Sequence, residues 1–299
     1  MTSRSCISLK NVSKTYGGQP VLRNIDLEVP AGTFQLLLGH NGAGKSTLLR
    51  ALAGMEHFSS GERYLFGDSA EALTPQQREA IYFVSESIYF DLPMMVKDLI
   101  PIHENLYRNF DTTYFLKILE SLRLDIYKNL DTFSRGGRMQ VTLALGLSIK
   151  PKLLVLDEIT AVLDAQARAY LVLALSEFVS RGGTVILASN IVSEAQDVCS
   201  HIIMLQRGEL RLHVSLSEMN ERFIKLKSKN ALPLERLDSL ARTGFVAVHG
   251  NRDHSTSFVA SADKRGMMAE YPDLEFDKRS VTAEDVFVYF STVLNDLKQ

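Results

Sequence analysis

The stretch GHNGAGKST, residues 39–47, decides the fold of this chain. It fits the pattern G-x-x-x-x-G-K-[ST], a glycine-rich loop whose backbone N–H groups turn inward around an anion. Lys45 supplies a point charge for the outer phosphates of a nucleotide, and the hydroxyl of Ser46 is a suitable magnesium ligand. The residues expected to hold the nucleotide here are Gly39, Asn41, Gly42, Ala43, Gly44, Lys45, Ser46 and Thr47.

The segments on either side of the loop strengthen this interpretation. FQLLLG, residues 34–39, is typical of a buried strand, and TLLRALAGM, residues 47–55, is typical of a helix. The positive end of that helix points at the phosphates that the loop surrounds. Strand, glycine loop and helix in this order predict a nucleotide-binding α/β domain.

The rest of the chain divides into regions with different periodicity. Short β-like runs fill residues 5–38, helical spacing dominates 87–150, and strands then alternate with helices. This alternation predicts a largely parallel sheet covered on both faces. We expect a nucleotide-binding domain over 1–217, with a helical subdomain over about 87–150, and a small C-terminal α+β domain over 218–299.

Composition limits the possible functions. The 299 residues carry a formal net charge of -2, which argues against a protein that holds nucleic acid mainly by charge. Two isolated cysteines, Cys6 and Cys199, favour a reducing cytoplasm over a disulfide framework. The N-terminus lacks the apolar core of a signal peptide, and no apolar run approaches the roughly 20 residues that span a bilayer. Any action at a membrane would therefore need a partner.

A second motif, LLVLDE at residues 153–158, adds the chemistry that the loop lacks. An apolar strand that ends in two carboxylates places Asp157 at the carboxyl edge of the sheet, where ligands bind in open α/β folds. Asp157 can hold magnesium opposite Ser46. Glu158 can then act as general base on the water that attacks the γ-phosphate.

A third motif, FSRGG at residues 133–137, precedes the helical run RMQVTLALGLSI. It resembles the signature loop of the ATP-binding cassette (ABC) ATPases, and AVLD at 161–164 resembles their D-loop. Tyr16 stands where that family places an aromatic that stacks on adenine. SESIYFDLP at 85–93 is similar to the Q-loop, and ASNIVSEA at 188–195 is similar to the switch loop. The resemblance covers about residues 5–215, with the motifs in the family's order.

The resemblance implies the ABC ATPase fold, a P-loop core sheet with an antiparallel β subdomain and a helical subdomain. It also implies ATP and Mg²⁺ as cofactors and a head-to-tail pair of ATPase chains, identical or different. In such a pair, Ser134, Gly136 and Gly137 would reach the γ-phosphate held by the other chain, and Asp164 would lie at the seam.

Three positions depart from the family's pattern. Glu86, a possible third magnesium ligand, replaces a glutamine, and Arg135 replaces a glycine of the signature. Asn190 replaces a histidine; it can bond a phosphate oxygen but cannot carry a proton. With Lys45, Glu158 and Asn190 as catalytic residues, we expect a working ATPase.

The leading hypothesis is the ATPase subunit of an ABC exporter, peripheral on the inner face of the cell membrane through a polytopic permease on a separate chain. The ending VTAEDVFVYF is similar to the terminal helix of exporters with a C-terminal extension. The surface expected to dock the permease carries Ile88, Tyr89, Phe90, Leu92, Met94 and Met95. The alternatives are a soluble ABC protein that remodels ribosomes or DNA, and a regulatory ATP switch with slow hydrolysis.

Overall fold

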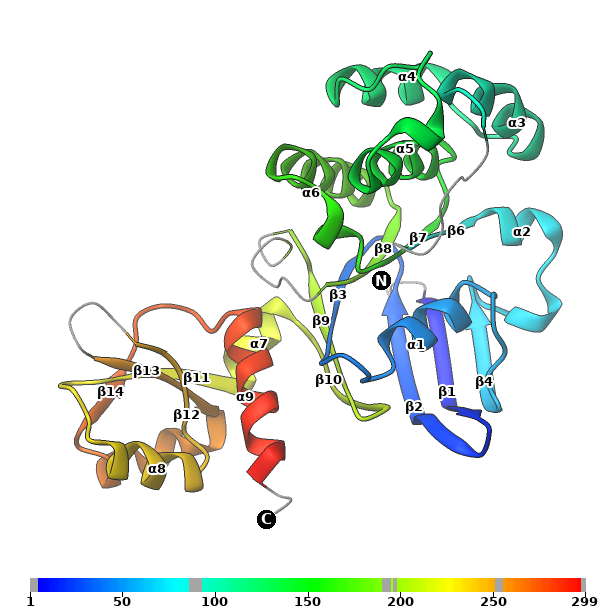
Figure 1. The fold of residues 1–299 in the computed structure, drawn as a ribbon. Helices are drawn as coiled ribbons and strands as arrows, with labels where there is room; N and C mark the ends of the chain where they lie inside the picture. The colour runs from blue at the N-terminus through cyan, green and yellow to red at the C-terminus, as the bar shows by residue number, and fades with distance from the viewer. Residues whose placement is uncertain (1–4, 86–92, 190–194, 196–197, 251–254, 297–299) are drawn as a thin grey trace. The chain divides into compact units, whose positions relative to one another are not determined.

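The structure is a computed structural model that describes residues 5–85, 93–189, 195, 198–250 and 255–296 (Figure 1). The chain divides into two compact units, Met1–His213 and Val214–Gln299. The division lies a few residues before the boundary at 217 expected from the sequence.

The first unit contains an antiparallel sheet in the order β2-β1-β4-β5. Its strands are β1 (Ser5–Tyr16), β2 (Gln19–Pro30), β4 (Ser60–Leu65) and β5 (Asp68–Ser69). β1 and β2 form a hairpin closed by Gly17 and Gly18, whose φ angles are 54° and 82°. Positive φ at both central residues gives the turn whose twist matches paired strands. This sheet is the antiparallel β subdomain that the sequence resemblance implied.

The second sheet of this unit has the order β10-β9-β3-β8-β7-β6. Its strands are β3 (Phe34–Leu38), β6 (Ile81–Ser85), β7 (Leu153–Asp157), β8 (Thr184–Ala188), β9 (His201–Gln206) and β10 (Glu209–Ser215). The pairings of β9 with β3, β3 with β8, β8 with β7, and β7 with β6 are all parallel. Every residue of β3, β7 and β8 is buried, and all of them except Gln35, Asp157 and Thr184 are apolar, as expected for strands covered on both faces. The predicted parallel sheet is confirmed.

Helices complete the first unit. They are α1 (Lys45–Leu52), α2 (Pro75–Glu79), α3 (Leu99–Leu106), α4 (Thr112–Ser121), α5 (Arg135–Ser148) and α6 (Ala165–Ser180), with 3-10 turns at Ala70–Ala72, Val96–Asp98, Leu130–Thr132 and Ile159–Val162. Figure 1 shows α3 and α4 gathered beside α5, away from the sheet of β1, β2 and β4. Across the described residues, no helix is long and apolar enough to cross a membrane.

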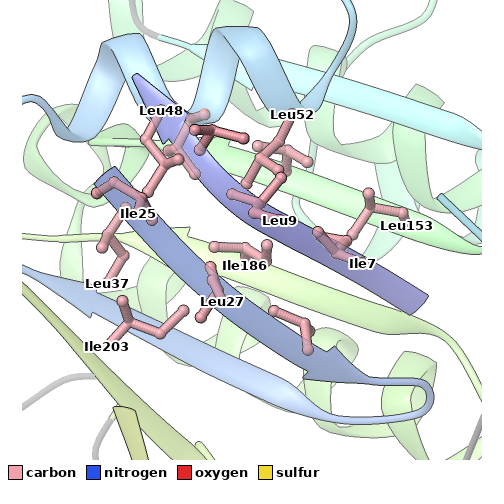
Figure 2. Packing of buried hydrophobic residues seen from close by; sticks show 14 of the residues in the cluster. Ile7, Leu9, Ile25, Leu27, Leu37, Leu48, Leu52, Leu153, Ile186 and Ile203 are labelled. Carbon is pink, nitrogen blue, oxygen red and sulfur yellow. The ribbon is translucent and has the colours of Figure 1, made fainter. Parts of the chain in front are cut away.

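Helix α1 is fixed by one hydrophobic cluster that draws on both sheets. Its Leu48 and Leu52 pack with Leu9 of β1 and with Leu153 and Ile186 of the parallel sheet (Figure 2). Each of these five residues is at most 2% exposed. Full burial of a leucine or isoleucine side chain is worth about 1.5–3 kcal/mol. The start of α1, and with it the glycine loop, is therefore held rigidly against the sheet edge.

The second unit is an antiparallel sheet in the order β12-β13-β11-β14 with helices packed on it. The strands are β11 (Phe223–Ser228), β12 (Val246–Gly250), β13 (Thr256–Ser261) and β14 (Leu274–Phe276); the helices are α7 (Leu216–Arg222), α8 (Leu234–Arg242) and α9 (Ala283–Asp296), with a 3-10 helix at Ala262–Glu270. Phe245 and Phe258 are fully buried in its core. Thr282 caps α9, since its Oγ1 accepts the backbone N–H of Asp285 at 3.2 Å.

Candidate functional site

The glycine loop joins β3 to α1 and depends on glycine at two positions. Gly44 is the residue before α1 and has φ 103°, a conformation that side chains disfavour. A Cβ at Gly39 would lie 2.4 Å from the carbonyl oxygen of Leu205, so no side chain fits there. The loop can therefore bend its backbone N–H groups around an anion, as the sequence pattern predicts.

Lys45 is the buried cation of this loop. Its side chain is 3% exposed, and its Nζ donates a hydrogen bond to the carbonyl oxygen of Gly39 at 2.7 Å. The same nitrogen lies 3.2 Å from Oε1 of Glu158. The Lys45 ammonium group thus contacts both the glycine loop and the residue that follows β7, although these two segments are far apart in the sequence.

Ser46 and Asp157 form the second link between the loop and β7. The Ser46 hydroxyl donates to Oδ1 of Asp157 at 3.1 Å. Burial raises the pKa of the Asp157 carboxyl, against the hydrogen bond from Ser46 and the charges of Arg50 and Lys45, which lower it. A carboxylate and a hydroxyl side by side are oxygen donors of the kind that Mg²⁺ accepts together with substrate phosphates and water.

Glu158 directly follows β7 in an uncommon backbone conformation. Its φ and ψ are 52° and 32°, and its backbone N–H donates to Ala188 at 3.0 Å. The left-handed region costs a residue other than glycine about 1–2 kcal/mol. Such strain persists where surrounding structure imposes it, and it clusters at functional sites. The carboxylate, 36% exposed, lies at the surface beside Lys45.

A pocket of about 300 Å³ lies over the loop. It is lined by Val21, Asn41, Gly42, Gly44, Lys45, Ser46, Thr47 and Glu158. Six of the eight loop residues expected from the sequence thus line one pocket, together with Glu158. Gly39, Ala43 and Asp157 are buried and do not line the pocket. The Ala43 carbonyl oxygen accepts the N–H of Gly208 at 2.9 Å. Val21 was not expected, because it lies in β2 and belongs to none of the motifs.

Tyr16 does not line this pocket. It ends β1 and is 43% exposed. Its hydroxyl donates a hydrogen bond to the carboxylate of Glu56, and the ammonium of Lys14 lies 4.8 Å from the centre of its ring.

The signature residues lie at the start of α5. Ser134 is the N-cap, and its Oγ accepts the N–H of Gly137 at 3.1 Å. The prediction that the helix starts after Gly137 is wrong: with Ser134 as cap, both glycines fall in the first helical turn. A Cβ at Gly136 would lie 2.6 Å from the Val162 carbonyl oxygen, so this glycine permits close packing against the D-loop.

The D-loop ends at Asp164, which caps α6. Its Oδ1 accepts the N–H of Ala167 at 2.8 Å. Neither Asp164 nor the signature residues Ser134, Gly136 and Gly137 belong to the lining of the pocket over the loop.

Glu86 and Asn190 lie outside the described residues, as do Ile88, Tyr89, Phe90 and Leu92 of the expected docking surface. Ser85, next to Glu86, and Ala188, close to Asn190, belong to the described strands. Ser85 pairs with Asp157 in β6 and β7, and Asp157 pairs with Ala188 in β8. The chain therefore leaves β6 and β8 on either side of Asp157. Met94 and Met95 are both half-buried.

These observations define a P-loop nucleotide-binding protein, and comparison with known proteins identifies its family. A family model described as ABC transporter matches residues 22–161. The Nod factor export ATP-binding protein I of Rhizobium johnstonii is 33% identical over 221 residues, 71% of each chain. The protein of the same name from Cupriavidus metallidurans is 30% identical over 271 residues, 87% of this chain and 84% of the relative. A probable sulfate/thiosulfate import ATP-binding protein of Chlorella vulgaris is 32% identical over 228 residues, 72% of this chain and 93% of the relative.

Solved structures agree on the fold. The ATP-binding subunit of an ABC transporter superposes with a TM-score of 0.66 at 21% identity, covering 72% of this chain and 92% of the other. An ATP-binding cassette solved as a dimer in a post-hydrolysis state, bound to ADP and Pi, gives a TM-score of 0.61 at 23% identity, covering 70% and 98%. This chain belongs to the ABC transporter family, as an ATP-binding subunit with the ABC ATPase fold. It binds ATP and is an ATPase.

Proposed function

We propose that this chain hydrolyses ATP to power an exporter through a separate membrane subunit. The observation that carries the proposal is the meeting of Lys45, Glu158 and the Ser46–Asp157 pair at one edge of the parallel sheet. In this arrangement Lys45 binds the outer phosphates. Glu158, strained and partly exposed beside them, accepts a proton from the attacking water as general base. Asn190 orients the γ-phosphate by hydrogen bonding.

Ser46 and Asp157 are the residues that hold magnesium, and Glu86 is a third candidate. The 3.1 Å distance between the Ser46 hydroxyl oxygen and Oδ1 of Asp157 supports this, because two oxygens so close together can bind the same cation. When bound, Mg²⁺ neutralises charge that develops on the phosphates. Burial raises the pKa of Asp157 and so favours its protonated form, whereas a cation is bound by the ionised carboxylate. A nearby divalent charge would favour the ionised form and so oppose the effect of burial.

The site is completed by a second ATPase chain, identical or homologous. Ser134, Gly136, Gly137 and Asp164 do not line the pocket over their own loop, which supports a role at another chain's nucleotide. The exposed start of α5 directs the positive end of that helix outward. Phosphate from the partner's ATP would lie there, and Asp164 would lie at the seam between the chains. Tyr16 stacks on the adenine.

One relative named for export matches far enough to include the second unit, which favours export. The first unit makes up 213 of the 299 residues, so a match that covers 87% of the chain extends into the second unit. That relative is named for export. The import-type relative from Chlorella vulgaris covers 72% of the chain. We place the chain on the inner face of the membrane, docked to a polytopic permease through the helical subdomain and the region 86–98.

Affinity purification of the tagged chain from its native host tests this function. We expect a polytopic membrane protein to be recovered in stoichiometric amount, and membrane vesicles carrying both proteins to transport only with ATP. Recovery with ribosomes or DNA instead would overturn the exporter. A wild-type chain that binds ATP but hydrolyses it no faster than Glu158→Gln would favour a regulatory switch.

A further inference from the structure

We propose that Glu56 positions Tyr16 for the adenine base and couples it to helix α1 of the phosphate loop. The proposal rests on the role of Tyr16 proposed above. Glu56 belongs to none of the sequence motifs. Its significance comes from the groups that its carboxylate gathers from two separate elements.

The end of helix α1 determines where Glu56 lies. The N–H of Met55 donates to the carbonyl oxygen of Arg50 at 2.9 Å, and the N–H of Gly54 donates to that of Ala51 at 3.2 Å. Gly54 has φ 78°. This pair of bonds around a left-handed glycine is the Schellman motif, which reverses the chain at a helix end. The residue that follows it, Glu56, is therefore turned back toward the last turn of α1.

The carboxylate of Glu56 joins three side chains. Its Oε2 accepts the hydrogen bond of the Tyr16 hydroxyl and lies 3.5 Å from Nζ of Lys14. Its Oε1 lies 2.9 Å from Nε of Arg50. The Glu56 side chain is 22% exposed, so water weakens these interactions less than it would at the open surface. One carboxylate thus links the end of β1 to α1.

Three further hydrogen bonds hold the same two segments together. Nζ of Lys14 donates to the His57 carbonyl oxygen at 2.6 Å. The N–H of Thr15 donates to Oγ of Ser59 at 3.0 Å, and the N–H of Ser59 donates to the Ser13 carbonyl oxygen at 2.7 Å. The loop after α1 is thereby fastened to β1 without Glu56. The contribution of Glu56 is more specific: it fixes the Tyr16 ring by its hydroxyl.

The link has a consequence for nucleotide binding. Arg50, which pairs with Glu56, stands one helical turn after Ser46 on α1. A base stacked on Tyr16 would be held by a side chain tied to the same helix that presents the phosphate ligands. Glu56 should therefore contribute to binding of a nucleotide and not to binding of bare phosphates.

The test compares two probes, Mg–ATP and inorganic Mg–triphosphate, by calorimetry on the full chain. The variants are Tyr16→Phe, Glu56→Gln and the double variant. Loss of the one hydrogen bond that fixes the Tyr16 ring predicts that the dissociation constant for ATP rises about fivefold in each variant. The double variant should bind no worse than either single one, and the constant for triphosphate should stay unchanged.

A second tyrosine of the same subdomain provides a matched control. The Tyr64 hydroxyl donates to Oε2 of Glu62 at 2.9 Å, and Nζ of Lys10 lies 5.2 Å from the Tyr64 ring. This trio repeats the chemistry of Lys14, Tyr16 and Glu56 away from α1, so Glu62→Gln should change neither constant. The role of Glu56 would be overturned, and the proposed function left standing, by either of two results. In one, Glu56→Gln loses equal affinity for ATP and for triphosphate. In the other, the wild type binds ATP and Glu56→Gln binds it equally well. A wild type that binds neither probe would overturn the proposed function as well.

Discussion

Nζ of Lys45 lies 3.2 Å from Oε1 of Glu158, although the two residues belong to different motifs separated by the whole helical region. The ion pair places the phosphate-binding cation and the candidate base in direct contact. Phosphate oxygens of ATP would compete for the same ammonium group. Binding of ATP would thereby free the Glu158 carboxylate to receive a proton from water.

Glu158→Gln tests that assignment. Glutamine keeps the size of the side chain but cannot accept the proton, so we expect turnover to fall by about 10²–10⁴-fold. Affinity for Mg–ATP should change little, because the loop and Lys45 are intact. Steady-state phosphate release and equilibrium binding give the two numbers. A variant with wild-type turnover would remove Glu158 from the mechanism.

Asp157→Asn should make the nucleotide-free protein more stable. Burial raises the pKa of Asp157, so the folded chain binds this proton more tightly than the unfolded chain. Ionisation therefore destabilises the fold above the folded pKa, and this penalty disappears as pH falls through it. We expect the melting temperature at pH 7.5 to rise by about 2 °C, the effect of about 1 kcal/mol.

Asp157→Asn also removes a proposed magnesium ligand. In wild type, Mg–ATP should raise the melting temperature more than ATP with EDTA does, and in Asp157→Asn this difference should disappear. Melting curves at pH 7.5 and at pH 4.5 check both parts. The difference between wild type and Asp157→Asn should shrink at the lower pH. A variant that is less stable at pH 7.5 would contradict the inferred penalty.

Ser134 has two roles that substitution can separate. Aspartate caps helices as well as serine does, so Ser134→Asp should keep the unfolding free energy within about 0.5 kcal/mol, whereas Ser134→Ala should lose about 1 kcal/mol. The added carboxylate would repel the partner's γ-phosphate. We therefore expect Ser134→Asp to abolish the dimer that Mg–ATP induces in the Glu158→Gln background, measured by light scattering.

Asp111 supplies the matched control for this prediction. It caps α4 through the N–H of Tyr114 at 2.8 Å, and it has no proposed part in the site. Asp111→Ala should lower stability by a similar amount and leave ATP-induced dimerisation intact. Loss of the dimer in this control would mean that helix stability, not phosphate contact, governs assembly.

Lys225 and Asp285 form an ion pair inside the second unit, with 2.5 Å between Nζ and Oδ2 and side chains 5% and 0% exposed. Removing one partner of a buried pair costs about 3–5 kcal/mol. Lys225→Met should therefore lower the stability of the second unit strongly, and adding Asp285→Asn should recover most of the loss. Urea unfolding followed by tyrosine fluorescence measures both. Equal stability of wild type and Lys225→Met would contradict this reading.

Local patterns predicted much of the fold. The runs 34–39 and 153–158 were expected as strands from their apolar residues, and they form β3 and β7. The loop residues and the carboxylates at 157 and 158 could be assigned to one site because parallel strands end at the same sheet edge. The start of α5 was misplaced because Ser134 caps a turn that contains two glycines.

Contacts between segments far apart in the sequence could not be predicted from local sequence patterns. Val21 lines the pocket although it lies in β2, outside every motif, and Glu56 meets Tyr16 after a left-handed Gly54 reverses the chain. The ion pair between Lys45 and Glu158 likewise depends on the strand order of the parallel sheet. No single motif encodes these distances, since they arise from how separate elements pack.

Mixing two inactive variants tests most directly the claim that each site is built from two chains. Lys45→Ala spoils the phosphate loop but keeps Ser134, and Ser134→Asp spoils the signature but keeps Lys45. A mixed dimer has one complete site, so an equimolar mixture should regain ATPase activity that neither preparation shows alone. A mixture of folded variants that hydrolyses ATP no faster than the two preparations measured separately would contradict the two-chain site.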